Sequence, residues 1–222
     1  MQQNEMYQTA SASSAIEINK VLRNTYSLLA MTLLFSAVVA GIAMSLNVPH
    51  PGFIISLVGI YGLMFLVHKT ANSGIGVISI FAFTGFLGYC IGPMLNMVIG
   101  SGGGDLVMLA MGGTALIFFS LSGYVLTTKK DMSFMGGMMT ALVVVLIVGM
   151  IANIFLAIPA MSLAISALFI LLSSGMILMQ TSSIIHGGEK NYILATVTLF
   201  VSIYNLFTSL LHLLMAFGGG DD

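Results

Sequence analysis

The chain has 222 residues, of which 58% are hydrophobic and only 6% are charged. Soluble domains carry about 25% charged residues, so this composition excludes an ordinary soluble protein and predicts a membrane protein. The formal net charge is -1, and no basic stripe with interleaved aromatic residues occurs. The sequence therefore gives no indication of a nucleic-acid partner.

Seven apolar stretches are long enough to cross a bilayer, which takes about 20 apolar residues in a helix. Because lipid offers no hydrogen-bond partners, these stretches must be helices, and their continuous apolar character excludes the alternating strands of a barrel. The sequence predicts an all-α, polytopic seven-transmembrane-helix bundle. The predicted spans are 24–46, 52–67, 75–99, 106–127, 134–156, 160–185 and 192–216.

The basic residues predict the orientation of this bundle. All of them precede the first span or lie in the connections after the second, fourth and sixth spans: Lys20, Arg23, Lys69, Lys129, Lys130 and Lys190. The other connections contain no Lys or Arg. The positive-inside rule then places the N-terminus in the cytoplasm and the C-terminus outside.

The ends of the chain differ from the spans in composition. Residues 1–20 are mostly polar and show no apolar periodicity, which predicts a disordered cytoplasmic tail. The first span has an apolar run of about 20 residues, too long for the 7–15-residue core of a cleavable signal peptide. We expect a transmembrane domain over 21–217 and a short external tail over 218–222.

No residue pattern indicates a metal, a cofactor or a disulfide. Cys90 is the only cysteine, so no internal disulfide can form. The 18 Met residues are scattered at packing spacing, which favours core filling over a copper site. The seven acidic residues all lie in the tails and connections.

Small residues recur within the spans and predict close helix packing. They are Gly85, Gly88, Gly92, Gly112, Gly113, Gly136 and Gly137. Gly92 is followed by Pro93, which removes a backbone donor and predicts a kink in the third helix. Such a kink can line a cavity, or the neighbouring helices can repack around it.

A few polar side chains lie inside the spans, where they are candidates either for helix–helix hydrogen bonds or for lining a permeation path. They are Asn153, Gln180, Ser202, Asn205 and His212.

The segment SLSG at 120–123 resembles the nucleophile turn of an intramembrane serine protease. However, Ser122 and His212 are predicted to differ in depth by more than about 20 Å, too far for a nucleophile and its base. His186 lies on the correct side of the bundle, but nothing in the sequence places it beside Ser122. We therefore expect no enzyme.

Several segments carry a resemblance to a known family. GVIS at 76–79 and GYCIGPML at 88–95 resemble the signature of the Bax inhibitor-1 (TMBIM) family. VLRNTY (21–26), KTAN (69–72), FAFTGFLG (81–88), TTKKDMSF (127–134) and IIHGGE (184–189) are similar to its bacterial YccA-like branch. The resemblance runs from about Val21 to about Leu211. It implies a bacterial inner-membrane protein in which the other six helices surround the seventh.

Many members of the resembled family are thought to be pH-sensitive calcium leaks gated by two aspartates. The matching positions here are Gln180, which precedes Thr181, and Ser202, which precedes Asn205-Leu206-Phe207. A neutral pair cannot share a titrating proton or offer Ca²⁺ an anionic oxygen site. The resemblance leaves an ion leak channel for calcium or protons as the alternative function, and the neutral residues at these two positions argue against it.

The YccA-like branch implies a different function. Its partner would be an FtsH-type membrane AAA protease, together with the stomatin-like companions of that protease. The resemblance implies a non-enzymatic modulator of membrane-protein quality control, acting as a substrate that occupies the protease. A flexible cytoplasmic end would be needed for engagement, and residues 1–19 are predicted to supply one.

Overall fold

The computed structural model describes the backbone of residues 2–218 and the side chains from Ile16 onward. The described chain is all-α, with seven helices long and apolar enough to cross a membrane. They are α1 (Gln2–Ser45), α2 (Phe53–Thr70), α3 (Gly76–Gly100), α4 (Gly104–Thr128), α5 (Gly136–Leu156), α6 (Pro159–Ile185) and α7 (Tyr192–Gly218), with a 3-10 turn η1 (Ser133–Met135) before α5. The predicted fold class is confirmed.

The helix ends agree closely with the predicted spans. Apart from the start of α1, the largest difference is at α2, which ends at Thr70 where the sequence predicts residue 67. The agreement follows from physical chemistry, because the length of an apolar run and its flanking polar residues set where a helix leaves the bilayer.

The N-terminal segment differs from the prediction of a disordered tail. Helix α1 begins at Gln2, and residues 16–20 continue it with described side chains. The side chains of residues 1–15 lie outside the described part, as do residues 219–222 of the predicted external tail. A helix nucleated in the span extends at little cost through residues such as Glu17 and Lys20, which favour helix.

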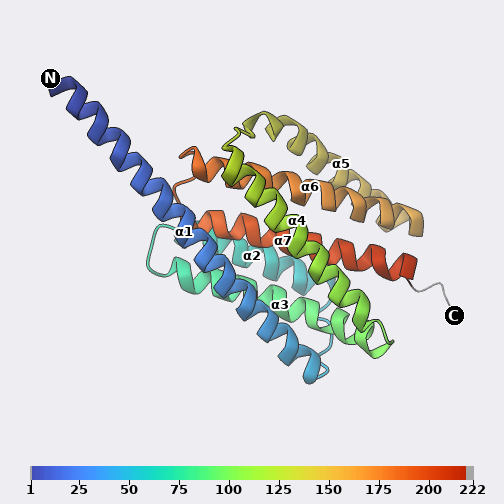
Figure 1. The fold of residues 1–222 in the computed structure, drawn as a ribbon. Helices are drawn as coiled ribbons and strands as arrows, with labels where there is room; N and C mark the ends of the chain where they lie inside the picture. Colours follow the sequence, from blue (N-terminus) through green and yellow to red (C-terminus); the bar gives the residue numbers. More distant parts are fainter. Residues whose placement is uncertain (1, 219–222) are drawn as a thin grey trace.

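Helix α7 is central in the bundle. It contacts α1, α2, α3, α4 and α6 (Figure 1). Among the described residues, α5 contacts only α6 and η1, so the expectation that all six other helices surround α7 is wrong for α5. Only Met139 and Leu146 of α5 are buried. Apolar surface facing lipid tails incurs no hydrophobic penalty, so a helix this apolar can remain at the periphery.

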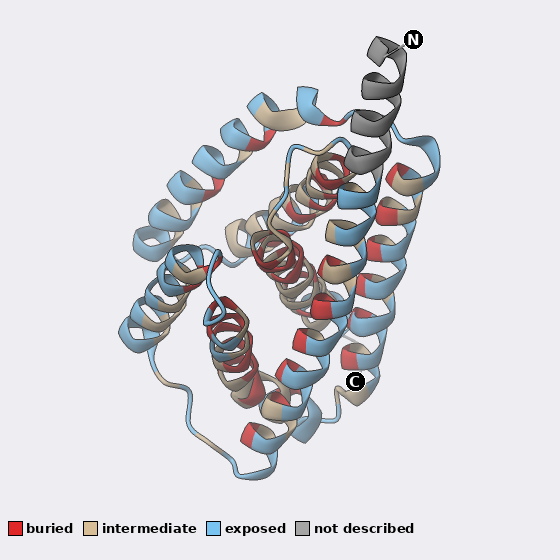
Figure 2. Ribbon diagram, turned by 90° about the vertical axis from the view of Figure 1, so that its left-hand side faces the viewer, coloured by how far each residue is buried: buried red, intermediate tan, exposed pale blue. Residues whose placement is uncertain are grey.

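The core lies around α7 and the inner face of α3. From α7, Ile193, Leu199, Phe200 and Leu206 are completely or almost completely buried, and Phe83 of α3 packs in the same cluster. Figure 2 shows the buried residues on the faces that meet inside the bundle and the exposed residues on the outer faces. Many of these exposed side chains are large and apolar, as expected for a surface that faces lipid.

The predicted close packing at glycines is confirmed for α3. A Cβ atom added at Gly88 would overlap the backbone carbonyl of Ser36 in α1, and one added at Gly92 would lie 2.6 Å from the Ala43 Cβ. The prediction is wrong for Gly112 and Gly137, where an added Cβ would have nothing within 4 Å. Helix α3 runs unbroken through Pro93, and the kink at this position stays a prediction.

Candidate functional site at the basic end of the bundle

The Lys and Arg residues gather at one end of the bundle, which we call the basic end. It consists of the N-terminal part of α1 with Lys20 and Arg23, the end of α2, and the α2–α3, α4–α5 and α6–α7 connections, which meet on the same side in Figure 1. The three connections are joined by hydrogen bonds through the α6–α7 turn, residues 186–191.

Asn191 joins this turn to the α2–α3 connection. Its side-chain N–H groups donate to the Ala71 carbonyl at 3.1 Å and to the Asn72 side-chain oxygen at 2.8 Å. Its own side-chain oxygen accepts from the backbone N–H groups of Ile193 at 2.9 Å and Leu194 at 3.2 Å. Asn191 therefore caps the start of α7 and fixes a connection about 120 residues away in sequence.

His186 of the same turn and Ser182 of α6 both contact the α4–α5 connection. The His186 ring lies with Nε2 at 3.1 Å from the Lys129 carbonyl and Nδ1 at 2.8 Å from the Ser182 carbonyl. The Ser182 hydroxyl accepts from the Met132 N–H at 3.0 Å and lies 3.3 Å from the Lys130 carbonyl. These contacts pair backbone groups of the α4–α5 connection that no helix hydrogen bond satisfies.

Asp131 shapes the α4–α5 connection itself. Its carboxylate accepts a hydrogen bond from the Ser133 N–H at 2.9 Å, just before α5. This bond, and to a smaller extent a second one from the Ser133 hydroxyl, holds the pKa of Asp131 below its usual range. The carboxylate is therefore charged near neutral pH and places a negative charge among the lysines of the basic end.

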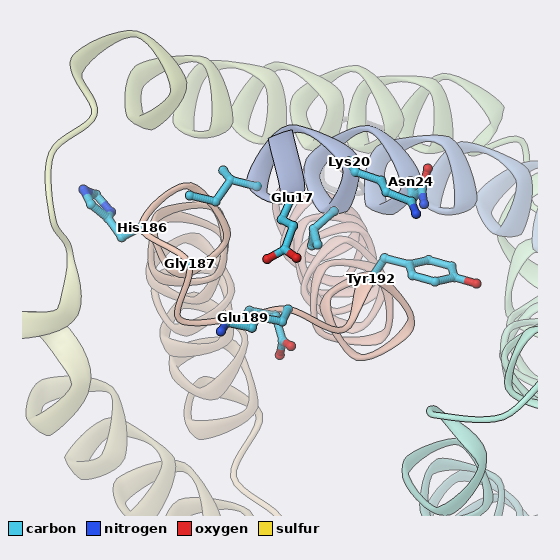
Figure 3. Close-up of a pocket in the computed structure, with 10 residues that line it drawn as sticks. Glu17, Lys20, Asn24, His186, Gly187, Glu189 and Tyr192 are labelled. Atoms are coloured by element: carbon cyan, nitrogen blue, oxygen red, sulfur yellow. The ribbon is translucent and has the colours of Figure 1, made fainter. Parts of the chain in front are cut away.

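A cavity of about 530 Å³ lies between α1 and the α6–α7 turn (Figure 3). Glu17, Lys20 and Asn24 line it from α1, and Glu189 and Lys190 line it from the turn. Glu17 points from α1 toward the turn, whereas the His186 ring points away toward the α4–α5 connection. The cavity thus brings acidic and basic side chains together where the apolar spans end.

The polar residues predicted from the sequence to be site residues lie deeper in the bundle. The amide nitrogen of Gln180 is buried and has no hydrogen-bond partner among the described residues, and the Ser202 hydroxyl donates to the Thr198 carbonyl at 2.8 Å. Ser166 pairs with His212 across the antiparallel α6 and α7. This pair sets the register of the two helices and places Gln180 level with residue 198 of α7. Ser202 therefore lies about four residues, or ~6 Å along the bundle axis, farther from the basic end than Gln180. The roles of Gln180, Ser202 and Asn205 remain predictions.

The serine and histidine residues considered for catalysis have separate partners. His212 Nδ1 lies 2.8 Å from the Ser166 hydroxyl, whereas the Ser122 hydroxyl lies 3.5 Å from that of Thr181. Thr181 is also 3.3 Å from the Tyr26 hydroxyl, which links α1, α4 and α6. Ser122 and His212, the pair considered from the sequence, are therefore not brought together as a nucleophile and its base.

Sequence reasoning did not single out Asn191 or Ser182 as structural centres of the basic end. A signal for Asn191 was present, because an Asn directly before an apolar helical run is a typical helix N-cap. Its contacts to Ala71 and Asn72 could not be found from local sequence. The segments 69–72, 127–134 and 184–189, which carry the resemblance, all contribute to this hydrogen-bonded end.

The fold and the basic end together define a polytopic all-α protein with seven membrane-spanning helices, in which the seventh helix is central. The family model described as "Inhibitor of apoptosis-promoting Bax1" (Bax1-I) matches residues 18–219. The chain belongs to this Bax inhibitor-1 family.

Close relatives occur in several bacteria. The chain is 61% identical over 202 residues to "Modulator of FtsH protease YccA" of Escherichia coli (strain K12), covering 91% of this chain and 92% of that protein. The same identity and coverage hold for "Inner membrane protein YccA" of Escherichia coli O6:H1. An uncharacterised protein of Pseudomonas aeruginosa is 52% identical over 222 residues, covering 99% of this chain and 100% of the relative.

Proposed function

We propose that this protein is a non-enzymatic modulator of an FtsH-type membrane AAA protease, acting in the bacterial inner membrane as a substrate that occupies the protease. The observation that carries the proposal is the 61% identity, over almost the whole chain, to a protein named a modulator of FtsH protease. The match covers 91% of the chain, so it includes the three connections of the basic end.

The proposed orientation places the basic end and the N-terminus in the cytoplasm. Its support is the position of the Lys and Arg residues, all of which lie at the basic end. Reporter fusions after Lys130 and Lys190 should behave as cytoplasmic, and fusions after Gly103 and Phe217 as exported. An exported reporter after Lys190 would contradict this orientation.

The structure suggests how such a substrate could occupy a protease without rapid degradation. An AAA protease pulls from a chain end, and the N-terminus lies at the basic end (Figure 1). At the same end, the α6–α7 turn is hydrogen-bonded to the α4–α5 and α2–α3 connections. Pulling on α1 would therefore meet a turn and a central helix that unfold cooperatively, which slows extraction.

Co-purification tests the proposal. The intact chain, carrying an affinity tag at its C-terminus, should retain the protease after extraction in mild detergent, and the stomatin-like companions should accompany it. The control is a variant lacking residues 2–15, which keeps the side chains that line the cavity. Loss of the protease with this variant alone would support engagement through the N-terminal end. Absence of the protease from the intact chain would overturn the proposal.

A further inference from the structure

The described residues that line the cavity between α1 and the α6–α7 turn carry balanced charges. Two carboxylates, Glu17 and Glu189, and two ammonium groups, Lys20 and Lys190, line it. One oxygen of Glu189 accepts from the Asn191 N–H at 2.7 Å, which leaves the other oxygen available. A volume of about 530 Å³ is within the range of about 300–1,000 Å³ that small-molecule sites occupy.

The cavity also lies where the apolar runs of α1, α6 and α7 end, which is where lipid headgroups are expected. Its lining comes from the last polar turns of α1 before the apolar run, from the turn after α6 ends at Ile185, and from Tyr192, the first residue of α7. Ile18 and Val21 add an apolar wall on the α1 side. A Tyr at the end of a span is typical of the membrane–water interface.

We propose that this cavity binds a zwitterionic headgroup that combines a phosphate with a primary ammonium, as in phosphatidylethanolamine. The lysines would hold the phosphate, and Glu17 and Glu189 would accept hydrogen bonds from the ammonium. A purely anionic headgroup would place its negative charge beside the Glu17 and Glu189 carboxylates, which would repel it. A choline headgroup has no N–H to donate, and its recognition uses several Trp, Tyr or Phe side chains, whereas Tyr192 is the one such residue among the described residues of this lining.

Lipid binding to the purified full-length protein tests the proposal. The protein is delipidated in mild detergent and titrated with phosphatidylethanolamine, phosphatidylcholine and phosphatidylglycerol of identical acyl chains, with bound lipid counted by native mass spectrometry. The wild type should bind one phosphatidylethanolamine with about fivefold preference over each of the others, since partly exposed charge pairs each contribute up to about this factor. Equal binding of all three lipids would overturn the proposal.

Two sets of variants separate the parts of the site. Glu17→Gln with Glu189→Gln should abolish the preference for phosphatidylethanolamine over phosphatidylcholine, and Glu17→Lys should favour phosphatidylglycerol. Lys20→Gln with Lys190→Gln should weaken binding of all three lipids, because the phosphate is common to them. The controls are Asp105→Asn at the opposite end and Lys69→Gln at the basic end but outside the cavity. An effect of either control as large as that of the cavity variants would overturn the proposal.

A further experiment with a water-soluble headgroup compound identifies whether the headgroup alone or the whole lipid is bound. Glycerophosphoethanolamine is added to the delipidated protein under the same conditions. Binding of the lipid alone would support the proposal with the bilayer as source, and binding of both would support it with the headgroup as sufficient. Binding of neither would overturn it. The protease is absent from these experiments, so their outcome is independent of the proposed modulation.

Discussion

The side chain of Asn191, in the turn before α7, donates a hydrogen bond to the side chain of Asn72 between α2 and α3, at 2.8 Å. The same amide also donates to the Ala71 carbonyl and caps α7 through its oxygen. One residue thus combines a helix cap with a connection between distant loops, and substitutions can separate the two roles.

Replacing Asn191 with Ala should destabilise the protein by about 2–3 kcal/mol, since a helix cap contributes ~1 kcal/mol and each further hydrogen bond a similar amount. Asn191→Asp keeps an oxygen for the Ile193 and Leu194 N–H groups but loses the amide donors, so it should cost about half as much. Thermal unfolding in detergent measures both. Equal losses for the two variants would contradict the assigned cap.

The α4–α5 connection should become more accessible when His186 is replaced. His186→Ala removes the contact with the Lys129 carbonyl, and loss of about 1 kcal/mol raises the population of the opened loop about fivefold. Limited trypsin digestion at Lys129 and Lys130 should accelerate accordingly. The control is His68→Ala, because among the described residues the His68 ring hydrogen-bonds to the Met64 carbonyl of its own helix and not to a connection of the basic end. Unchanged cleavage in His186→Ala would contradict the role of this contact.

The glycine contact between α3 and α1 predicts opposite results for one substitution at two positions. Gly88→Ala should destabilise the bundle by about 1–3 kcal/mol, because its Cβ would overlap the Ser36 carbonyl, which belongs to backbone and cannot move aside cheaply. Gly112→Ala has open space and should be neutral or stabilising by up to about 1 kcal/mol. Unfolding midpoints compared in the same detergent measure the difference. Similar effects at both positions would contradict the close approach.

The neutral residues at the positions of the family's paired aspartates predict little acid-sensitive calcium flux. In liposomes the unmodified protein should show no pH-gated Ca²⁺ flux above that of empty liposomes. Gln180→Asp with Ser202→Asp should gain flux, since paired carboxylates supply both an oxygen site and a titratable group. Gln180→Asn with Ser202→Thr is the matched neutral control. Strong flux from the unmodified protein would favour the leak channel instead.

The sequence predicted the spans well because each is a local property: an apolar run of fixed length, bounded by residues such as Lys69 and Lys129. It failed where contacts between distant segments decide the structure. Nothing local distinguishes Gly88, which α1 approaches closely, from Gly112, which faces open space. The peripheral place of α5 and the joining of three connections by His186 and Asn191 likewise depend on packing that periodicity does not encode.

The most direct test of the central claim is a degradation assay in liposomes that contain a purified FtsH-type protease and a fluorescent membrane-protein substrate. Adding this chain should slow loss of the substrate in proportion to its amount, while the chain itself is degraded slowly. The variant lacking residues 2–15 should outlive the intact chain if the protease pulls from the N-terminal end. An unchanged rate of substrate loss at a several-fold excess of the intact chain would contradict the claim that it modulates the protease.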